Sequence, residues 1–175
     1  MQGKALEKAS PPAPKRAHAA ILFSDLSASS ELAVAHEPEA FADLVRSVKV
    51  ELETSVVACG GVVVQFQGDG VLALFGYPGA AETAGRRAVE AAVEAHRRVR
   101  AAFDDAARLD APPVRLHSGV HAGLVLVAGG DTANGLYELF GDAVNLASRI
   151  AAVARPDEIL VSRETLSAFD GAFET

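Results

Sequence analysis

The chain has 175 residues, half of them hydrophobic, and a formal net charge of −7 at pH 7. That length suits one domain with a sizeable core, and the acidic balance argues against binding to nucleic acid or an anionic membrane, since both reward a basic face. A single cysteine excludes an internal disulfide and favours a reducing, cytoplasmic compartment, while no apolar stretch is long enough for a membrane span.

Residues 1–17 precede the first apolar run and contain Pro11-Pro12-Ala13-Pro14-Lys15-Arg16. Such a proline-rich, charged stretch predicts a stiff, solvated linker. A linker here suggests that the folded domain, expected over 18–175, is attached to other regulatory domains.

The first half of this domain is predicted to contain a strand, two helices and a hairpin. The apolar run His18–Asp25 indicates a strand, and helices are expected over Ser29–His36 and Pro38–Val57. The hairpin comprises about Gly61–Phe66 and Gly70–Phe75, because an Asp-Gly step between two β-branched runs is a strong hairpin signal.

The second half is predicted to contain a long helix, a second hairpin, a loop over 129–135 leading to Tyr137–Phe140, a further helix, a strand and a short helix. The ranges are Ala81–Arg108, Pro113–His121 with Gly123–Ala128, Asp142–Val153, Glu158–Val161 and Arg163–Phe169. This β-α-β-β-α-β order predicts a ferredoxin-like α+β fold, a mixed sheet with helices packed on one face. Such a fold alone implies no function.

Two aspartates are placed where a metal-phosphate site would need them. Asp25 ends the first strand, and Asp69 lies at the tip of the first hairpin. For a single such aspartate, a helix cap or a turn is the commoner role. In this fold, however, the two elements lie side by side, so the carboxylates are expected to face each other closely enough to share a pair of divalent cations.

Two further segments are candidates for phosphate and nucleotide contacts. Ser27, Ala28, Ser29 and Ser30 form a small, polar stretch that opens a helix, where backbone N–H groups are suited to phosphate oxygens. Near the end of the chain, Asn145 and Arg149 are four residues apart and therefore share one helix face.

Together these segments resemble the catalytic domain of class III nucleotidyl cyclases, the adenylyl/guanylyl cyclase family, in its bacterial form. The resemblance covers about residues 18–170, and its strength comes from five motifs in the expected order. These motifs are Leu22–Leu26, Gln67–Gly76, Gly119–Gly123, Gly141–Arg149 and Glu158–Ser162.

The resemblance implies roles for individual residues. Asp25 and Asp69 would bind two divalent cations, Mg²⁺ or Mn²⁺, with the Leu26 carbonyl as a backbone ligand. Asn145 would orient the ribose, and Arg149 would stabilise charge on the reacting phosphate. The implied reaction is attack of the ATP ribose 3′-hydroxyl on the α-phosphorus, which forms 3′,5′-cyclic AMP and pyrophosphate. The family forms its sites between two chains, so a two-fold homodimer is also implied.

Base recognition departs from the family pattern. Adenylyl cyclases usually have Lys four residues before the second metal aspartate and Asp or Thr seven before the asparagine, where this chain has Gln65 and Glu138. An ionised Glu138 only accepts hydrogen bonds, which suits the adenine amino group, whereas Gln65 can face either way. We expect ATP as substrate, with GTP as the alternative.

Two other departures concern phosphate binding. The family usually continues into a further hairpin whose Lys contacts the triphosphate, and this chain has no Lys or Arg after Arg163. The expectation is that this C-terminal hairpin is missing, so that the chain is a fragment or its phosphate clamp is incomplete. Ala28 replaces a common Gly, which is tolerable where the backbone φ is negative.

Two alternatives to an active adenylyl cyclase follow. One is a weak or silent cyclase-homology domain that binds nucleotide or dimerises to regulate an attached module. The complete set of candidate metal and catalytic residues argues against it. The other is a diguanylate cyclase, which the sequence disfavours because Thr132-Ala133 follow Gly129-Gly130-Asp131 where an acidic residue and Phe are expected.

Overall fold

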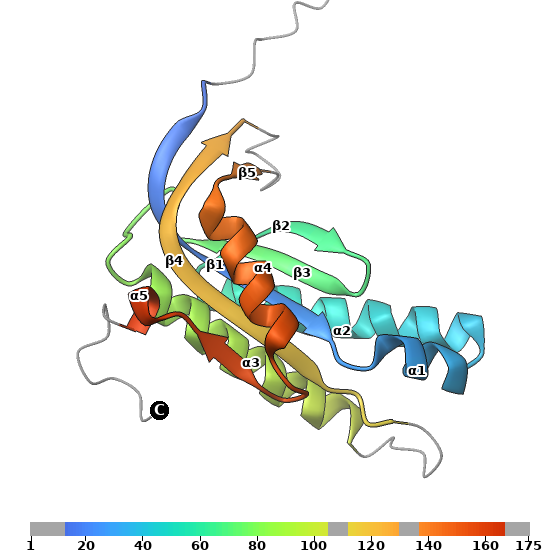
Figure 1. Ribbon diagram of the computed structural model, residues 1–175. Coiled ribbons are helices and arrows are strands. Elements are labelled where there is room, and N and C mark those ends of the chain that lie inside the picture. The colour runs from blue at the N-terminus through green and yellow to red at the C-terminus, as the bar shows by residue number, and fades with distance from the viewer. Residues whose placement is uncertain (1–12, 105–111, 130–136, 167–175) are drawn as a thin grey trace, which may run out of the picture.

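A mixed β-sheet lies between two layers of helices in the computed structural model, which describes residues 13–104, 112–129 and 137–166 (Figure 1). Among these residues the sheet has six strands, and their order is β2-β3-β1-β4-β5, with β6 beside β4. Their bounds are β1 Lys15–Leu26, β2 Val62–Gln67, β3 Gly70–Phe75, β4 Leu116–Ala128, β5 Glu138–Phe140 and β6 Ile159–Val161.

Neighbours along the β2-to-β5 path are antiparallel, and β6 is parallel to β4. The first four strands therefore have the ferredoxin-like order, with β5 and β6 added around β4. The predicted α+β fold with a mixed sheet is confirmed. In particular, β3 of the first hairpin pairs with β1, as the prediction for the two aspartates requires.

Strand β4 shows that the predicted second hairpin is wrong. β4 runs without a break from Leu116 to Ala128, and its residues from Leu116 to Val127 pair with β1. A Cβ added at Gly123 would lie 3.1 Å from the Cβ of Ala143. Gly123 therefore allows helix α4 to approach closely instead of forming a turn.

Strand β1 begins at Lys15, three residues before its predicted start. Lys15, Arg16 and Ala17 pair with residues 125–127 of β4, because that partner strand is long enough to extend the ladder. The linker expected over 1–17 therefore does not reach residue 17, and residues 1–12 lie outside the described part.

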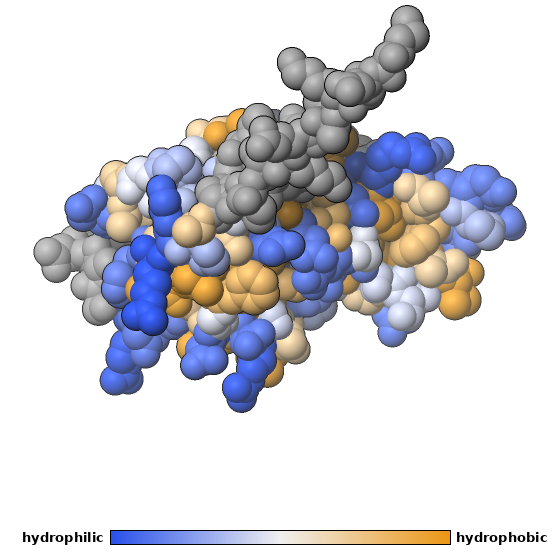
Figure 2. Space-filling model, turned by 90° about the horizontal axis from the view of Figure 1, so that it is seen from above, coloured by the Kyte–Doolittle hydropathy of each residue, from blue (hydrophilic) through white to orange (hydrophobic). Residues whose placement is uncertain are grey.

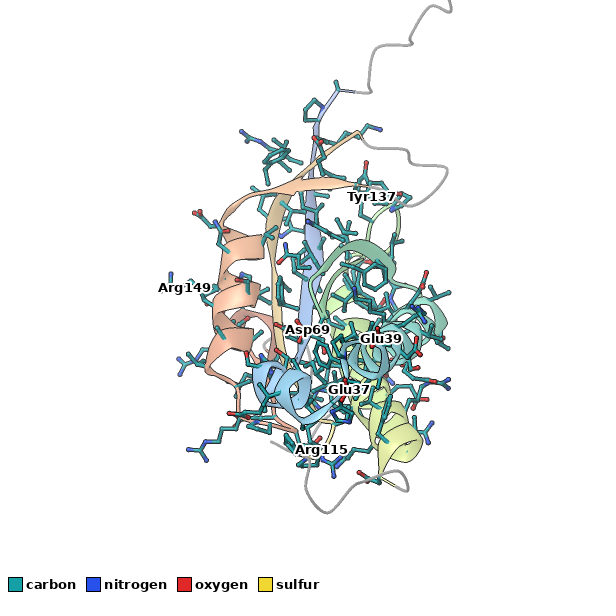
Figure 3. All side chains as sticks on the ribbon, turned by 90° about the vertical axis from the view of Figure 1, so that its right-hand side faces the viewer. Glu37, Glu39, Asp69, Arg115, Tyr137 and Arg149 are labelled. Carbon is teal, nitrogen blue, oxygen red and sulfur yellow. The ribbon has the colours of Figure 1, made fainter. Side chains whose placement is uncertain are left out.

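Helices cover both faces of the sheet, which corrects the prediction of a single covered face. Figures 1 and 3 show α4 on one side and α2 with α3 on the other. Ala20 and Leu22 of β1 belong to a core cluster with α3, whereas Ile21 belongs to a cluster with Ala143 and Ala147 of α4. The helices are α1 Ser29–Ala35, α2 Pro38–Ala58, α3 Ala84–Phe103, α4 Asp142–Val153 and α5 Arg163–Leu166.

A stripe of small residues on α3 packs against the sheet. Ala88, Ala91, Ala92, Ala95 and Val99 are fully buried. Their small side chains bring α3 close to β1 and β4. The predicted extensions of α3 to 108 and of α5 to 169 fall on residues outside the described part.

Candidate active site

The structure brings Asp25 and Asp69 together at one edge of the sheet. Asp25 is the second-last residue of β1, and Asp69 lies in the turn between β2 and β3. Ser24 pairs with Val71, so the ends of β1 and β3 lie side by side. A Cβ added at Gly70 would be only 2.8 Å from Asp25 Oδ1, so the carboxylate lies directly against the hairpin.

The surroundings of these two carboxylates favour the binding of a positive charge. Burial raises the pKa of Asp25, and the nearby charge of Asp69 raises it further. The Leu26 N–H donates to Asp25 Oδ1 at 2.9 Å and partly opposes this rise. Asp69 Oδ2 is buried and has no hydrogen-bond partner among the described residues. Both features fit a divalent cation, which would neutralise the repulsion and coordinate the unpaired oxygen.

The fold supplies only part of a metal coordination shell. Within residues 13–104, 112–129 and 137–166, no group of three or more His, Cys, Asp or Glu side chains is arranged to hold a metal ion. A cation bound by two carboxylates and main-chain oxygens would need other ligands to complete its coordination shell. Hard cations that keep water or phosphate oxygens in their shell are bound in this way.

The backbone after Asp25 is anchored on its other side by β4. Ser27 N donates to the Arg115 carbonyl at 2.7 Å, and Ser27 Oγ is 3.1 Å from His117 Nδ1. The Leu26 side chain is buried in the core beneath α2. These contacts hold the strand end in place, so the direction of the Asp25 side chain is set by the sheet.

Ala28 does not have the negative φ under which alanine would be tolerated in place of glycine. It has φ +54° and ψ +35°, in the left-handed region that favours glycine. Ala28 is also the N-cap of α1 and provides no side-chain cap. The first-turn N–H groups of α1, including those of Ser29 and Ser30, therefore have no side-chain acceptor from the cap residue.

His117, which no sequence motif indicated, pairs directly with Asp25 across β1 and β4. Its charge partly opposes the rise of the Asp25 pKa, and its ring contacts Ser27. Neighbours in such a pair have Cβ atoms about 5 Å apart. Only the register of β1 on β4 could have revealed this residue, and the incorrect hairpin prediction concealed that register.

Asn145 and Arg149 share one face of α4, as predicted, and both are exposed. The opposite face of α4 carries Ala143, Ala147 and Ala151, which are buried against the sheet. Figure 3 shows Arg149 pointing outward, away from Asp69. A single chain therefore does not bring this pair to the two aspartates.

The two residues expected to contact the base lie on strands at opposite ends of the β2-to-β5 path. A register shift between Val63 and Gln65 aligns Gln65 with Leu72, which belongs to the cluster beneath α4. This bulge therefore directs Gln65 to the α4 face of the sheet. Glu138 is exposed in β5, and strand alternation places it on the face opposite Leu139, which packs toward α4. Within one chain the structure does not bring Gln65 and Glu138 to the same face.

Comparison with known proteins agrees with this geometry. A family model described as the adenylate and guanylate cyclase catalytic domain matches residues 12–175. The adenylyl cyclase CyaB from P. aeruginosa has a TM-score of 0.80 at 28% identity, covering 90% of this chain and 82% of that one. The guanylyl cyclase Cya2 has a TM-score of 0.78, also at 28% identity, covering 88% and 79%.

Relatives found by sequence are longer than this chain. Uncharacterized protein Rv2212 of Mycobacterium tuberculosis is 32% identical over 144 residues, which are 81% of this chain and 32% of the relative. Adenylate cyclase 1 of Rhizobium meliloti is 30% identical over 132 residues, 74% of this chain and 20% of the relative. The chain thus spans about a third or less of the length of these relatives. It belongs to the family of class III adenylyl and guanylyl cyclase catalytic domains.

Proposed function

We propose that this chain is a class III cyclase that converts ATP to 3′,5′-cyclic AMP and pyrophosphate at a site shared by two copies. The observation that carries the proposal is the separation of two polar pairs within one chain. Asp25 and Asp69 lie together at a sheet edge, while Asn145 and Arg149 are exposed on α4, with Arg149 pointing outward (Figure 3). A two-fold dimer can place the second pair of one copy over the first pair of the other, twice.

The carboxylate half would hold Mg²⁺ or Mn²⁺ through Asp25, Asp69 and the Leu26 carbonyl. When bound, such cations lower the pKa of an attacking hydroxyl and neutralise triphosphate charge. Supporting this role, Asp69 Oδ2 is buried without a partner and the Asp25 pKa is raised. The uncapped first turn of α1, next to Ala28, would offer backbone N–H groups to phosphate oxygens.

The α4 half would act on the ribose and the reacting phosphate. Asn145 would hold the ribose so that its 3′-oxygen faces the α-phosphorus. As the new P–O bond forms, the bond to the β-phosphate oxygen breaks and pyrophosphate leaves. Arg149, a planar donor, would stabilise the charge that develops on the phosphate oxygens. The 3′-hydroxyl proton passes to solvent or phosphate.

Substrate choice depends on Gln65 and Glu138. We favour ATP, because an ionised Glu138 can accept from the adenine amino group, and the bulge that directs Gln65 to the α4 face supports a role for its amide. GTP is the alternative substrate, since an amide can face either way.

A second candidate function is a weak or silent cyclase-homology domain that regulates an attached module. The observation in its favour is that Glu138 lies on the sheet face opposite Leu139, whereas Gln65 faces α4. The length of the relatives supports a chain in which other domains are attached. None of the described helices is both long and apolar enough to cross a bilayer. We propose a cytoplasmic location, where nucleoside triphosphates are available.

The test is an assay of the purified chain with ATP and, separately, GTP in Mn²⁺, measuring cyclic nucleotide and pyrophosphate. Asp69→Ala and a dilution series serve as controls. Cyclic AMP that disappears in the variant, and whose specific rate falls on dilution, supports the proposal. Predominant cyclic GMP overturns the assignment of ATP, and no product from a folded dimer favours the regulatory function.

A further inference from the structure

A buried chain of polar side chains links helix α3 to the strand end that carries Asp25. His96 Nε2 lies 2.8 Å from Ser118 Oγ, which donates to Ser24 Oγ at 2.8 Å. His96 is 3% exposed, and both serines are fully buried. Ser24 and Ser118 face each other across β1 and β4, and Ser24 immediately precedes Asp25. The proposed reaction uses none of these three side chains.

A catalytic triad does not explain these hydrogen bonds, although Asp157, His96 and Ser118 follow one another in space as the acid, base and nucleophile of a hydrolase do. His96 Nδ1 is 3.9 Å from Asp157 Oδ1, which is too far for a hydrogen bond. Ser118 has no exposed surface, so no substrate can reach its hydroxyl. Burial lowers the pKa of His96 to about 4, which leaves the ring neutral at pH 7.

Each hydrogen bond between His96, Ser118 and Ser24 has a defined donor and acceptor. Because Ser118 donates its single hydroxyl proton to Ser24, the ring Nε2 of His96 must carry the proton that bonds to Ser118. Buried polar groups are costly unless they are paired, so this arrangement penalises displacement of α3 relative to β4 and β1. Apolar side chains at these positions would pack without such a directional preference.

The same strand end is confined on the β3 side. A Cβ added at Gly70 would lie 2.8 Å from Asp25 Oδ1 and 3.1 Å from the Ser24 carbonyl oxygen. The end of β1 therefore occupies the space that a side chain at residue 70 would fill, while the chain from His96 holds Ser24 from the α3 side. A small shift of Ser24 would move the Asp25 carboxylate relative to Asp69.

We propose that His96 is a positioning residue for the cation-binding end of β1, acting through Ser118 and Ser24. The inference rests on the proposed role of Asp25 in binding cations. Residues that orient metal ligands typically change metal affinity by about 10- to 100-fold when replaced. Because His96 acts through two intervening serines, we expect an effect near the lower end, about tenfold.

The test compares Ser118→Ala, which interrupts the chain, with Ser55→Ala. Ser55 is a matched control, because it is fully buried and its Oγ donates to the Glu51 carbonyl within α2. Mn²⁺ binding to the purified chain is measured by electron paramagnetic resonance with MnCl₂ alone, and exchange of the Leu26 amide by deuterium labelling. We expect Ser118→Ala to weaken Mn²⁺ binding about tenfold and to speed Leu26 exchange, while Ser55→Ala changes neither.

Two replacements of His96 separate positioning from simple packing. His96→Gln keeps an N–H donor and should bind Mn²⁺ more tightly than His96→Phe, which has none. Equal Mn²⁺ affinity and equal Leu26 exchange in wild type, Ser118→Ala and His96→Phe would overturn the proposal, as would equal losses in Ser55→Ala. If His96→Phe does not fold, Ser118→Ala decides the question.

Failure of the proposed cation site would be recognised separately. In that case wild type and Asp69→Ala would bind Mn²⁺ equally. The Leu26 amide would then still decide whether the chain from His96 holds the end of β1, because its exchange is measured without metal.

Discussion

The two halves of the proposed site differ in how firmly the fold holds them. The carboxylate end lies close against Gly70 and is held by the Leu26 N–H and by contacts of Ser27 with β4. Asn145 and Arg149, by contrast, are exposed and make no side-chain hydrogen bond or ion pair with the described residues. One half is organised before association, and the other acquires its contacts only from a partner or a substrate.

The surface around α4 is consistent with this difference. Exposed apolar side chains accompany Arg149 on or near this helix, including Leu146, Val153 and Phe140. Figure 2 shows apolar side chains interspersed with polar ones on the face seen from above. A mixed surface of this kind is suited to a second copy of the chain, whose association would order the exposed half.

Complementation between two inactive variants tests most directly whether the site is divided between two chains. Asp69→Ala and Arg149→Ala should each lose at least about a hundredfold in cyclase activity, because each removes charge stabilisation from both sites of a homodimer. Mixing the two variants should restore about a quarter of wild-type activity, since half of the dimers then carry one intact site. Cyclic nucleotide formation in the mixture measures the recovery.

The control mixture combines Asp25→Ala with Asp69→Ala, which damage the same half. It should remain inactive, because no dimer of these chains contains an intact carboxylate pair. Recovery in this control, or none in the first mixture, would contradict a site divided between the two regions.

The stability of the protein at acid pH tests the buried hydrogen-bonded chain that runs from His96 through Ser118 to Ser24. The His96 pKa is lowered to about 4, so between pH 6.5 and about 4 the unfolded chain binds a proton that the native one does not. The free energy of unfolding should therefore fall by on the order of 3 kcal/mol as the pH decreases through this window.

His96→Gln should lack most of this loss, as measured by urea denaturation at several pH values. The exposed His18, replaced in His18→Gln, provides the matched control. A loss that is the same in wild type and His96→Gln would show that the acid sensitivity originates elsewhere.

Asp25→Asn should raise the melting temperature of the metal-free protein at pH 7 by a few degrees. The pKa of Asp25 is raised by burial and by Asp69, so proton binding favours the native state and this benefit is lost as the pH increases above the raised value. The difference should therefore shrink as the pH falls toward 3.8, the ordinary value for Asp. Thermal scans in chelator measure it.

A second set of thermal scans with added Mn²⁺ tests the same residue, because Mn²⁺ should stabilise wild type and not Asp25→Asn. The exposed Asp43, replaced in Asp43→Asn, is the control. If Asp25→Asn is less stable than wild type at pH 7 without metal, the ionised Asp25 does not destabilise the metal-free protein and the prediction is wrong.

The smallest expected effect concerns Ala28. Its left-handed backbone costs an L-residue about 1–2 kcal/mol, while glycine loses about 0.5–1 kcal/mol more conformational entropy on folding. Ala28→Gly should therefore stabilise the protein by about 0.5 kcal/mol in urea denaturation. Ala33→Gly, in the interior of α1, should instead destabilise it by about 1 kcal/mol. A destabilising Ala28→Gly would contradict strain at this cap.

Most of the fold could be predicted from local patterns, whereas failures occurred where long-range packing decides. The Asp-Gly step predicted the turn of the first hairpin. Gly123 was wrongly predicted to form a turn. Glycine at this position instead allows the close approach of Ala143, which belongs to a helix twenty residues later in the chain. The φ of Ala28 could not be foreseen, because a backbone angle depends on how strand and helix meet.

The sequence by itself determined the order of elements apart from the second hairpin, the family, and the residue types that could serve metal, phosphate and base, since these depend on local composition and spacing. Only the tertiary structure decided which of them meet. Pairing of β1 with β3 brings Asp25 to Asp69, pairing with β4 adds His117, and packing of the alanine face of α4 on the sheet leaves Arg149 exposed. Proximity across a sheet depends on strand register, which forms only when distant segments of the chain pair.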